Sequence, residues 1–414
     1  MKAYLTKNDI ERNIANLPIL TFEVTDACNL KCKYCGYGEF YNDYDERKNT
    51  FLPFEYAKKI LDYLVPYWQS SLNKSAQRRI YIGFYGGEPL MNVPLIEKII
   101  EYINSNLSSK NLYFEYSMTS NAILLDKYMD FIVKNDFNLL ISLDGDKYGN
   151  SCRVDHSGQD AFERIIHNVN ALRKKYPDYF ERKVDFNSVL HNRNSVEETH
   201  SFIKKQYNKE PSINELSDSG IRADKKELFE STYRNYMESL YSAENYTALQ
   251  KEMFIKSGTY QSVCTFLHQY SGFVFKDYTD LIYAKNTKSI PAGTCMPFTK
   301  KMFITVTGKI LPCERIGQQY SLGTIDGNGI CLDLQSVADK YNAYYAKLEK
   351  QCAVCHQKKA CVQCLFQLED LEEKAICYGC MNKKDFDDYV NTQMAFIAQN
   401  PEEYYRIMEE VIVE

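Results

Sequence analysis

Three cysteines lie in the run Thr25–Gly36, directly after a short apolar stretch, with the spacing CxxxCxxC. They are Cys28, Cys32 and Cys35. Three thiolates can hold a four-iron, four-sulfur (4Fe–4S) cluster and leave its fourth iron without a protein ligand. An iron with an open position can bind a small molecule. A structural zinc site would need a fourth Cys or His, and the nearest downstream histidine is the distant His156.

A second chemical motif, Gly86-Gly87-Glu88-Pro89, follows the second apolar stretch of the chain. The two glycines let the backbone approach a ligand closely. Pro89 fixes the turn, and Glu88 can accept a hydrogen bond from an ammonium group. Alone this motif would indicate only a tight turn. Its place after a second strand, with CxxxCxxC after the first, predicts a shared site.

The two motifs together resemble the signature of the radical S-adenosylmethionine (SAM) enzymes. The resemblance implies that the open iron chelates the amino and carboxylate groups of SAM. It also implies that an electron from the cluster cleaves SAM to a 5′-deoxyadenosyl radical. The SAM contacts that it implies are Tyr34, Gly86, Gly87, Glu88, Pro89, Asn121, Ser142 and Arg153.

Several of these assignments have plainer alternatives. Tyr34, implied to lie near adenine, would otherwise be a half-buried loop aromatic. Arg153 suits a carboxylate ligand but could be a surface charge. Asn121, Asn187 and Asp144 stand at strand ends, where capping is as good an explanation as ligand contact.

Fourteen cysteines without a secretion signal favour metal binding or catalysis over disulfides. Nine of them fall between Cys295 and Cys380. Eight of the nine resemble the SPASM domain, an appendage of radical SAM enzymes that modify peptides and proteins. The resemblance implies two auxiliary 4Fe–4S clusters. The first takes Cys295, Cys313 and Cys364, with Cys377 as an uncertain fourth ligand, and the second takes Cys352, Cys355, Cys361 and Cys380.

This C-terminal set departs from the SPASM pattern in two places. The middle group ends Cys361-x2-Cys364 instead of x3, and the last cysteine is doubled, at Cys377 and Cys380. The choice between Cys377 and Cys380 therefore stays open, as does an open iron on the first auxiliary cluster. A zinc ribbon is the competing interpretation, but its two CxxC pairs usually stand ~15–20 residues apart.

Glu314 directly follows Cys313. Sulfatase-maturing relatives have an Asp at that position, proposed as a general base. Partial burial beside a cluster could raise the pKa of Glu314 and let it accept a proton. An ion pair with Arg315 is the equally good alternative.

Apolar and helix-like stretches alternate over residues 18–216, which predicts parallel strands with crossover helices. The resemblance makes this α/β region a partial (β/α)6 barrel. The expected strands are Pro18–Val24, Ile80–Tyr85, Leu112–Met118, Asn138–Leu143, Val184–Leu190 and Ser212–Leu216. The expected helices between them are Phe54–Trp68, Val93–Ser105, Lys127–Asn135, Ala161–Lys175 and Val196–Gln206. Both motifs would then lie at the carboxyl ends of strands, where such sheets place their working loops.

The rest of the chain is expected to form three further regions. Residues 217–290 would bridge the domains or contact substrate, 291–385 would form the SPASM domain, and 386–414 would add C-terminal helices. A polar helix is predicted at Asp224–Ser242, and a hairpin around Thr307-Gly308. The net charge of −5 gives no reason to expect nucleic acid, no stretch is apolar enough to cross a membrane, and the expected location is the cytoplasm.

The resemblance implies a maturase that modifies a ribosomally synthesised peptide, with a thioether or carbon–carbon crosslink as the expected product. Its cofactors would be three 4Fe–4S clusters and SAM, and flavodoxin or ferredoxin would supply electrons. Only about 17 residues precede the first strand, so leader binding is expected to fall to a separate protein or to residues 217–290, or to be dispensed with. The alternatives are an anaerobic sulfatase maturase that forms formylglycine and a non-catalytic iron–sulfur or zinc-binding protein.

Overall fold

The computed structural model describes residues 4–75, 77–108, 111–270, 290–291, 296–358 and 361–411. The chain forms two compact units, and neither is continuous in sequence. The sheet unit comprises Thr6–Ala243 and Pro297–Val337. The helical unit comprises Met1–Leu5, Glu244–Met296 and Ala338–Glu414.

The sheet unit is built on one sheet in the order β10-β9-β8-β7-β1-β2-β3-β4-β5-β6. From β7 to β6 all neighbouring strands are parallel, and β7 to β10 pair antiparallel. The strands are β1 (Ile19–Thr25), β2 (Arg79–Gly86), β3 (Tyr113–Ser120), β4 (Asn138–Ser142), β5 (Val184–Val189), β6 (Ser212–Asn214), β7 (Lys301–Ile304), β8 (Lys309–Leu311), β9 (Gly323–Ile325) and β10 (Ile330–Cys331).

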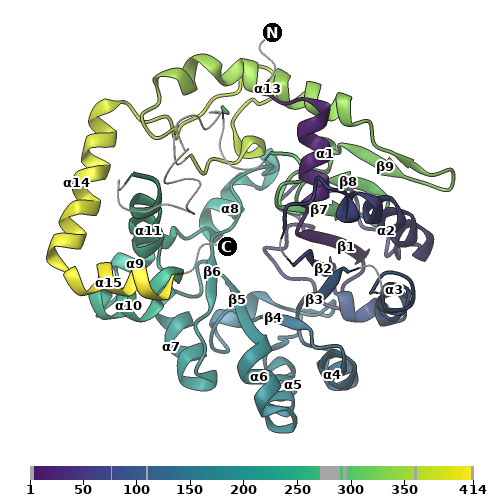
Figure 1. Cartoon of the computed structure of the whole chain (residues 1–414). Helices are drawn as coiled ribbons and strands as arrows, with labels where there is room; N and C mark the ends of the chain where they lie inside the picture. Colours follow the sequence, from purple (N-terminus) through teal and green to yellow (C-terminus); the bar gives the residue numbers. More distant parts are fainter. Residues whose placement is uncertain are drawn as a thin grey trace. The chain divides into compact units, whose positions relative to one another are not determined.

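Helices follow the parallel strands and lie along one face of the sheet (Figure 1). Their apolar side chains recur at helical spacing, as in α2, which buries Ile60, Leu64 and Trp68 against the unit's interior. The helices are α1 (Lys7–Ala15), α2 (Phe54–Gln69), α3 (Val93–Asn106), α4 (Leu125–Lys134), α5 (Phe162–Lys175), α6 (Pro177–Lys183), α7 (Val196–Tyr207), α8 (Lys226–Thr232) and α9 (Tyr236–Tyr241). Short 3-10 turns are η1 (Pro89–Asn92), η3 (Gly149–Cys152), η4 (Ala223–Lys225) and η6 (Gln318–Tyr320).

The predicted α/β class and the alternation of strands and helices are confirmed, including the weak sixth strand and the hairpin of β7 and β8. The single polar helix predicted at Asp224–Ser242 is wrong. The chain forms η4, α8 and α9 there instead. Asn235 interrupts the helix because its side chain accepts a hydrogen bond from the backbone N–H of Glu238 and caps a new one.

The helical unit contains α10 (Tyr246–Met253), η5 (Phe254–Lys256), α11 (Gly258–Tyr270), α13 (Leu334–Val354), η8 (Leu365–Gln367), α14 (Lys383–Gln399) and α15 (Pro401–Glu410). Its core joins α11 to Ile407 of α15, with α14 packed against both. The described residues between α13 and α14 carry many cysteines but only one short 3-10 helix. Segments with so little regular structure are often stabilised by a bound metal, because metal binding supplies part of their folding free energy.

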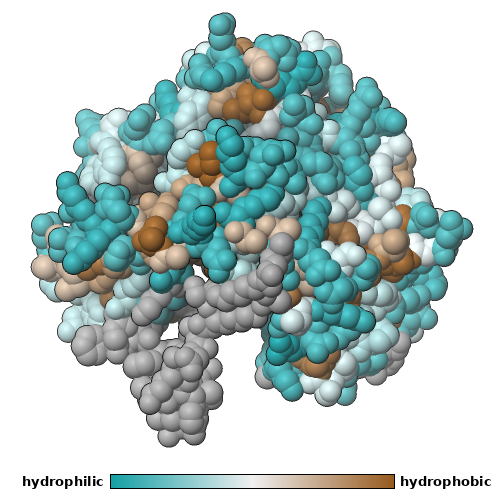
Figure 2. All heavy atoms as spheres, turned by 90° about the horizontal axis from the view of Figure 1, so that it is seen from above, coloured by the Kyte–Doolittle hydropathy of each residue, from teal (hydrophilic) through white to brown (hydrophobic). Residues whose placement is uncertain are grey.

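The described helices include none long and apolar enough to cross a membrane. On the face shown in Figure 2, hydrophobic residues occur as small groups scattered among hydrophilic ones.

Candidate functional site

The CxxxCxxC loop follows the carboxyl end of β1, and its three cysteine side chains are half-buried. Burial raises the pKa of Cys28 to about 11 and that of Cys32 to about 12. The thiolate, not the thiol, is the metal ligand, and a bound metal cation deprotonates a coordinating thiol. The desolvated loop therefore suits a cationic cluster.

A distant segment, residues 152–156, holds this loop in place. The backbone N–H groups of Lys31 and Lys33 donate to the carbonyl oxygens of Val154 at 2.7 Å and Cys152 at 3.0 Å. His156 Nε2 lies 2.8 Å from the carbonyl oxygen of Cys28, which can only accept, so the ring donates. His156 is therefore close to the loop in space, but this nitrogen is occupied and supports no zinc site.

The Gly86-Gly87 backbone packs directly against the cysteine loop. The N–H groups of Gly87 and Glu88 donate to the carbonyl oxygens of Thr25 and Ala27 at 2.8 and 2.9 Å. A Cβ atom on Gly87 would lie 2.1 Å from the Ala27 carbonyl oxygen, and Gly86 has a φ of +133° that disfavours other residues. The two motifs thus form one joined structure.

Gly87→Ala should destabilise the sheet unit by about 1–3 kcal/mol, because the new methyl group overlaps the cysteine loop. Urea unfolding followed by the fluorescence of Trp68 measures this, since Trp68 is the only tryptophan and is fully buried in α2. Gly327→Ala is the matched control, because its Cβ would meet no atom within 4 Å. Equal unfolding midpoints for the two variants would contradict the prediction.

The Glu88 carboxylate ties β2 to β3. It accepts from the Ser120 hydroxyl and the Asn121 N–H, both at 2.8 Å, and from the Leu90 N–H at 3.1 Å. Burial raises the pKa of Glu88 to about 7, although these donors oppose the shift. Glu88 thus shapes the turn through its side chain, and the SAM contacts of Gly86, Gly87, Glu88 and Pro89 stay predictions.

Asn121 reaches the cysteine loop from the end of β3. Its side-chain N–H group lies 3.7 Å from Cys28 Sγ and donates to Asn29 Oδ1 at 2.7 Å. Ser142 ends β4 opposite Asn187 of β5 and is largely buried. The structure therefore brings Asn121 beside the cysteine loop, and the SAM contacts of Asn121 and Ser142 stay predictions.

Arg153 is buried in an ion pair with Asp144. Its Nε and Nη2 atoms donate to the two Asp144 carboxylate oxygens at 2.9 and 2.8 Å, and the side chains are only 6% and 0% exposed. The Tyr34 hydroxyl donates to the same carboxylate. The His191 ring stacks on Tyr34, with centroids 5.4 Å apart. Arg153 thus already has a carboxylate partner, and its predicted contact with SAM stays a prediction.

His191 is a site residue that the sequence did not indicate, since its segment matches no motif. Burial alone would lower its pKa, but Asp144, with Oδ2 3.9 Å from Nε2, and Cys152 raise it to about 9. The Arg193 N–H donates to Nδ1 at 3.1 Å, and this contact opposes protonation of the ring because only the neutral ring can accept it. The Asp144 pKa is lowered to about 2, because Arg153 and His191 outweigh the effect of burial.

The raised pKa of His191 predicts a pH-dependent stability. Its contribution is fully present below the ordinary pKa of 6.5 and is lost as the pH rises through 9, on the order of 3 kcal/mol in total. The difference in unfolding free energy between wild type and His191→Asn should therefore shrink from pH 6.5 to pH 9. The exposed His167→Asn variant serves as control, and a constant difference for His191→Asn would contradict the assignment.

Glu314 forms an ion pair with Lys301. The ion pair that the sequence suggested was with Arg315. Both carboxylate oxygens lie 2.8 Å from Lys301 Nζ. Burial would raise the pKa of Glu314, yet Lys301 holds it below its ordinary value. The raised pKa expected from burial beside a cluster is therefore wrong, and a general-base role would have to compete with Lys301.

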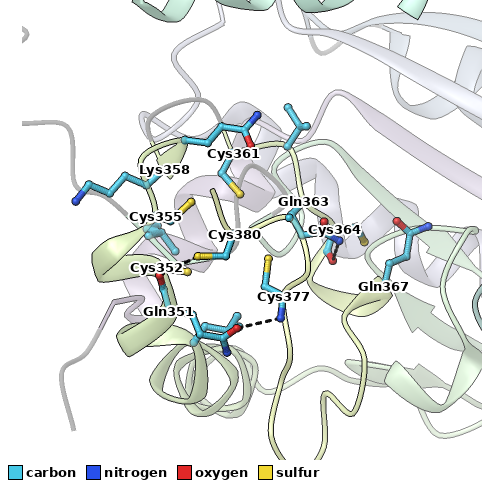
Figure 3. A pocket seen from close by; sticks show the side chains of 15 residues that line it. Gln351, Cys352, Cys355, Lys358, Cys361, Gln363, Cys364, Gln367, Cys377 and Cys380 are labelled. Atoms are coloured by element: carbon cyan, nitrogen blue, oxygen red, sulfur yellow. Dashed lines mark hydrogen bonds between the residues drawn. The ribbon is translucent and has the colours of Figure 1, made fainter. Parts of the chain in front are cut away.

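Six cysteines of the helical unit line one cavity of about 190 Å³. Figure 3 shows the thiols of Cys355, Cys361, Cys377 and Cys380 projecting toward common space. The cavity also includes Cys352 and Cys364. Burial and the neighbouring Cys355 thiol raise the pKa of Cys380 to about 11. Cys295 lies outside the described residues, so the ligand set of the first auxiliary cluster stays a prediction.

A zinc ion and a multi-iron cluster differ in the spacing that they require of their thiolate ligands. Tetrahedral zinc with Zn–S bonds of ~2.3 Å places its sulfurs only ~3.8 Å apart. Within the described part of the chain, no three cysteine sulfurs lie within 4.8 Å of one another. A 4Fe–4S cluster spreads its thiolates over four different irons, so a wider arrangement is what it requires.

Comparisons with known proteins indicate which family and fold this chain resembles. The family model of the Radical SAM superfamily matches residues 22–204. The uncharacterized protein MJ0907 of Methanocaldococcus jannaschii is 37% identical over 30% of this chain and 38% of its own length. The radical SAM cyclopropyl synthase TigE of Paramaledivibacter caminithermalis is 25% identical over 40% of this chain and 34% of its own. The chain thus spans little more than a third of these two relatives.

Longer matches come from sulfatase-maturating enzymes. A cysteine-type anaerobic sulfatase-maturating enzyme of Clostridium perfringens is 23% identical over 93% of this chain and 99% of its own. The solved structure of anSMEcpe with bound AdoMet superposes with a TM-score of 0.59 at 19% identity, covering 92% of this chain and 99% of that one. Its complex with AdoMet and the Cp18Cys peptide gives a TM-score of 0.57 at 20% identity. These likenesses show a shared fold over nearly the whole chain.

Proposed function

Because this chain is a radical SAM enzyme whose matched domain spans residues 22–204, we propose that it modifies a ribosomally synthesised peptide by closing a thioether or carbon–carbon crosslink. The observation that carries the proposal is the cavity lined by six cysteines. Such a set supports auxiliary clusters, which accompany peptide substrates in the SPASM enzymes that the sequence resembles. A relative solved with a bound peptide supports the same substrate class.

Cys28, Cys32 and Cys35 would hold the first cluster, and the joined glycine turn would present its backbone to SAM. A cluster bound by these cysteines would supply the electron for the reductive cleavage of SAM. Glu88 is buried and Cys28 and Cys32 are half-buried, so solvent has little access to these side chains. Excluding water protects a reactive radical from side reactions.

The remaining cofactor assignments belong to the proposal. The second auxiliary cluster would use Cys352, Cys355, Cys361 and Cys380, and the first would use Cys295, Cys313 and Cys364, with Cys377 as its candidate fourth ligand. Flavodoxin or ferredoxin in the cytoplasm would supply electrons, and a separate protein would bind the leader of the peptide. Glu314 stays the candidate base, and a proton that it accepts would weaken its ion pair with Lys301.

Sulfatase maturation is a second candidate, because the match to the Clostridium perfringens enzyme covers 93% of this chain. Its product would be a formylglycine aldehyde in a sulfatase peptide.

One experiment separates these candidates. The reconstituted protein is incubated without oxygen with SAM, a reductant, and either the peptides encoded beside its gene or a sulfatase-derived cysteine peptide. Crosslinking removes two hydrogens from a gene-neighbour peptide, whereas formylglycine is trapped by a hydrazine probe. Aldehyde formation alone would replace the first proposal with the second. SAM cleavage that modifies neither peptide would contradict both.

A further inference from the structure

Arg47 lies beside the cysteine loop, in the segment between β1 and α2. Its Nη2 atom donates to Cys35 Sγ at 3.4 Å. Its guanidinium carbon lies 4.3 Å from the centroid of the Tyr37 ring. Arg47 belongs to neither motif and is separated from Cys35 by a loop of no recognisable pattern, so the sequence did not indicate it.

The ring of Tyr37, on which the Arg47 guanidinium lies, is itself fixed by hydrogen bonds. The Tyr37 hydroxyl donates to Glu23 Oε1 at 2.6 Å, and Glu23 Oε2 accepts from the Val306 N–H at 2.9 Å. Glu23 itself is buried on β1. A planar guanidinium stacked on a ring held in this way has little freedom to turn away from Cys35.

One hydrogen-bond donor of Arg47 is unpaired within the described part of the chain. Its Nε atom is buried and has no hydrogen-bond partner among the described residues. A buried donor without a partner is costly, so it indicates an acceptor that the protein itself does not supply. A cluster bound in the cysteine loop would offer one beside Arg47, because Arg47 already donates to a thiol of that loop.

We propose that Arg47 is a positioning residue that raises the reduction potential of the cluster held by Cys28, Cys32 and Cys35. Reduction adds one electron, taken from an external carrier of the flavodoxin or ferredoxin class, to the cluster. A fixed cation and an N–H···S hydrogen bond stabilise the added negative charge, and such bonds are known determinants of cluster potential. The proposal rests on the cluster that the family implies and not on the identity of the peptide.

The test is a redox titration of the full-length, iron-loaded chain followed by electron paramagnetic resonance. The first cluster is recognised as the signal that changes when SAM is added. Arg47→Gln should make its reduction about tenfold less favourable, which for one electron corresponds to a potential lower by about 59 mV. Arg47→Lys keeps the charge but loses the planar fork, so its shift should be smaller. Arg12→Gln, an exposed arginine of α1, is the control and should leave the potential unchanged.

A wild-type potential in iron-loaded Arg47→Gln would overturn the proposal. If that variant does not load iron, Arg47→Lys decides, and a wild-type potential there would overturn it equally. Failure of the peptide proposal is a separate result. A chain that shows the shift but modifies no peptide keeps this inference and loses the other.

Discussion

Replacing Cys32 by Ser should abolish release of 5′-deoxyadenosine from SAM, lowering the rate by at least about a thousandfold, or ~4 kcal/mol in the barrier. The loop supplies three thiolates for four irons, so no spare ligand in the loop can take the place of Cys32. The chain has no duplicate of this loop, whereas its C-terminal cysteines include a doubled pair. Anaerobic incubation with SAM and dithionite, with chromatography of the nucleoside, measures the rate.

Iron content and a control variant show whether the loss of activity comes from loss of the cluster. The variant should also contain about four fewer irons per chain than wild type. Cys331→Ser is the matched control, because Cys331 is exposed on β10 and stands outside the spacing pattern. Cleavage of SAM at the wild-type rate by Cys32→Ser would show that these cysteines do not hold the catalytic cluster.

Asp144→Asn should destabilise the sheet unit by about 3–5 kcal/mol, because it leaves the buried Arg153 without its counter-charge. The same change replaces the charged acceptor of the Tyr34 hydroxyl by a neutral amide and removes the charge beside His191. Urea unfolding followed by Trp68 fluorescence reports on this unit, since Trp68 lies within it.

The control is Asp224→Asn, which removes an aspartate from an exposed pair with Arg222 at 2.9 Å. Solvent screens such a pair, so no resolved change in midpoint is expected. If Asp144→Asn unfolds at the same urea concentration as Asp224→Asn, the buried cluster does not stabilise the unit as described.

Apart from the short helix α6, the strands and longer helices of residues 18–216 were predictable because each depends on local spacing of apolar residues. The predicted strand Ile80–Tyr85 and β2 (Arg79–Gly86), for example, differ by one residue at each end. The joining of β7 to β1 was not predictable, because this parallel pair links residues nearly 300 positions apart. Residues 297–337 therefore belong to the sheet unit, although the cysteine pattern groups them with the C-terminal region.

The site divides in the same way. CxxxCxxC and Gly86-Gly87 were readable because each motif is a short run, and the structure joins them through backbone hydrogen bonds. Three site residues were missed, because folding alone brings them to the cysteine loop or its neighbours and no sequence motif includes them. They are His156, His191 and Arg47. Lys301, which decides the charge state of Glu314, is likewise thirteen positions away in sequence and carries no motif.

Cys28, Cys32 and Cys35 are proposed to hold a cluster whose vacant iron binds SAM. Electron paramagnetic resonance of the reduced, anaerobically reconstituted protein, recorded before and after adding SAM, tests it most directly. We expect the spectrum of the wild-type protein to change when SAM is added. We expect no such change in Cys32→Ser. An identical spectrum with and without SAM would contradict it.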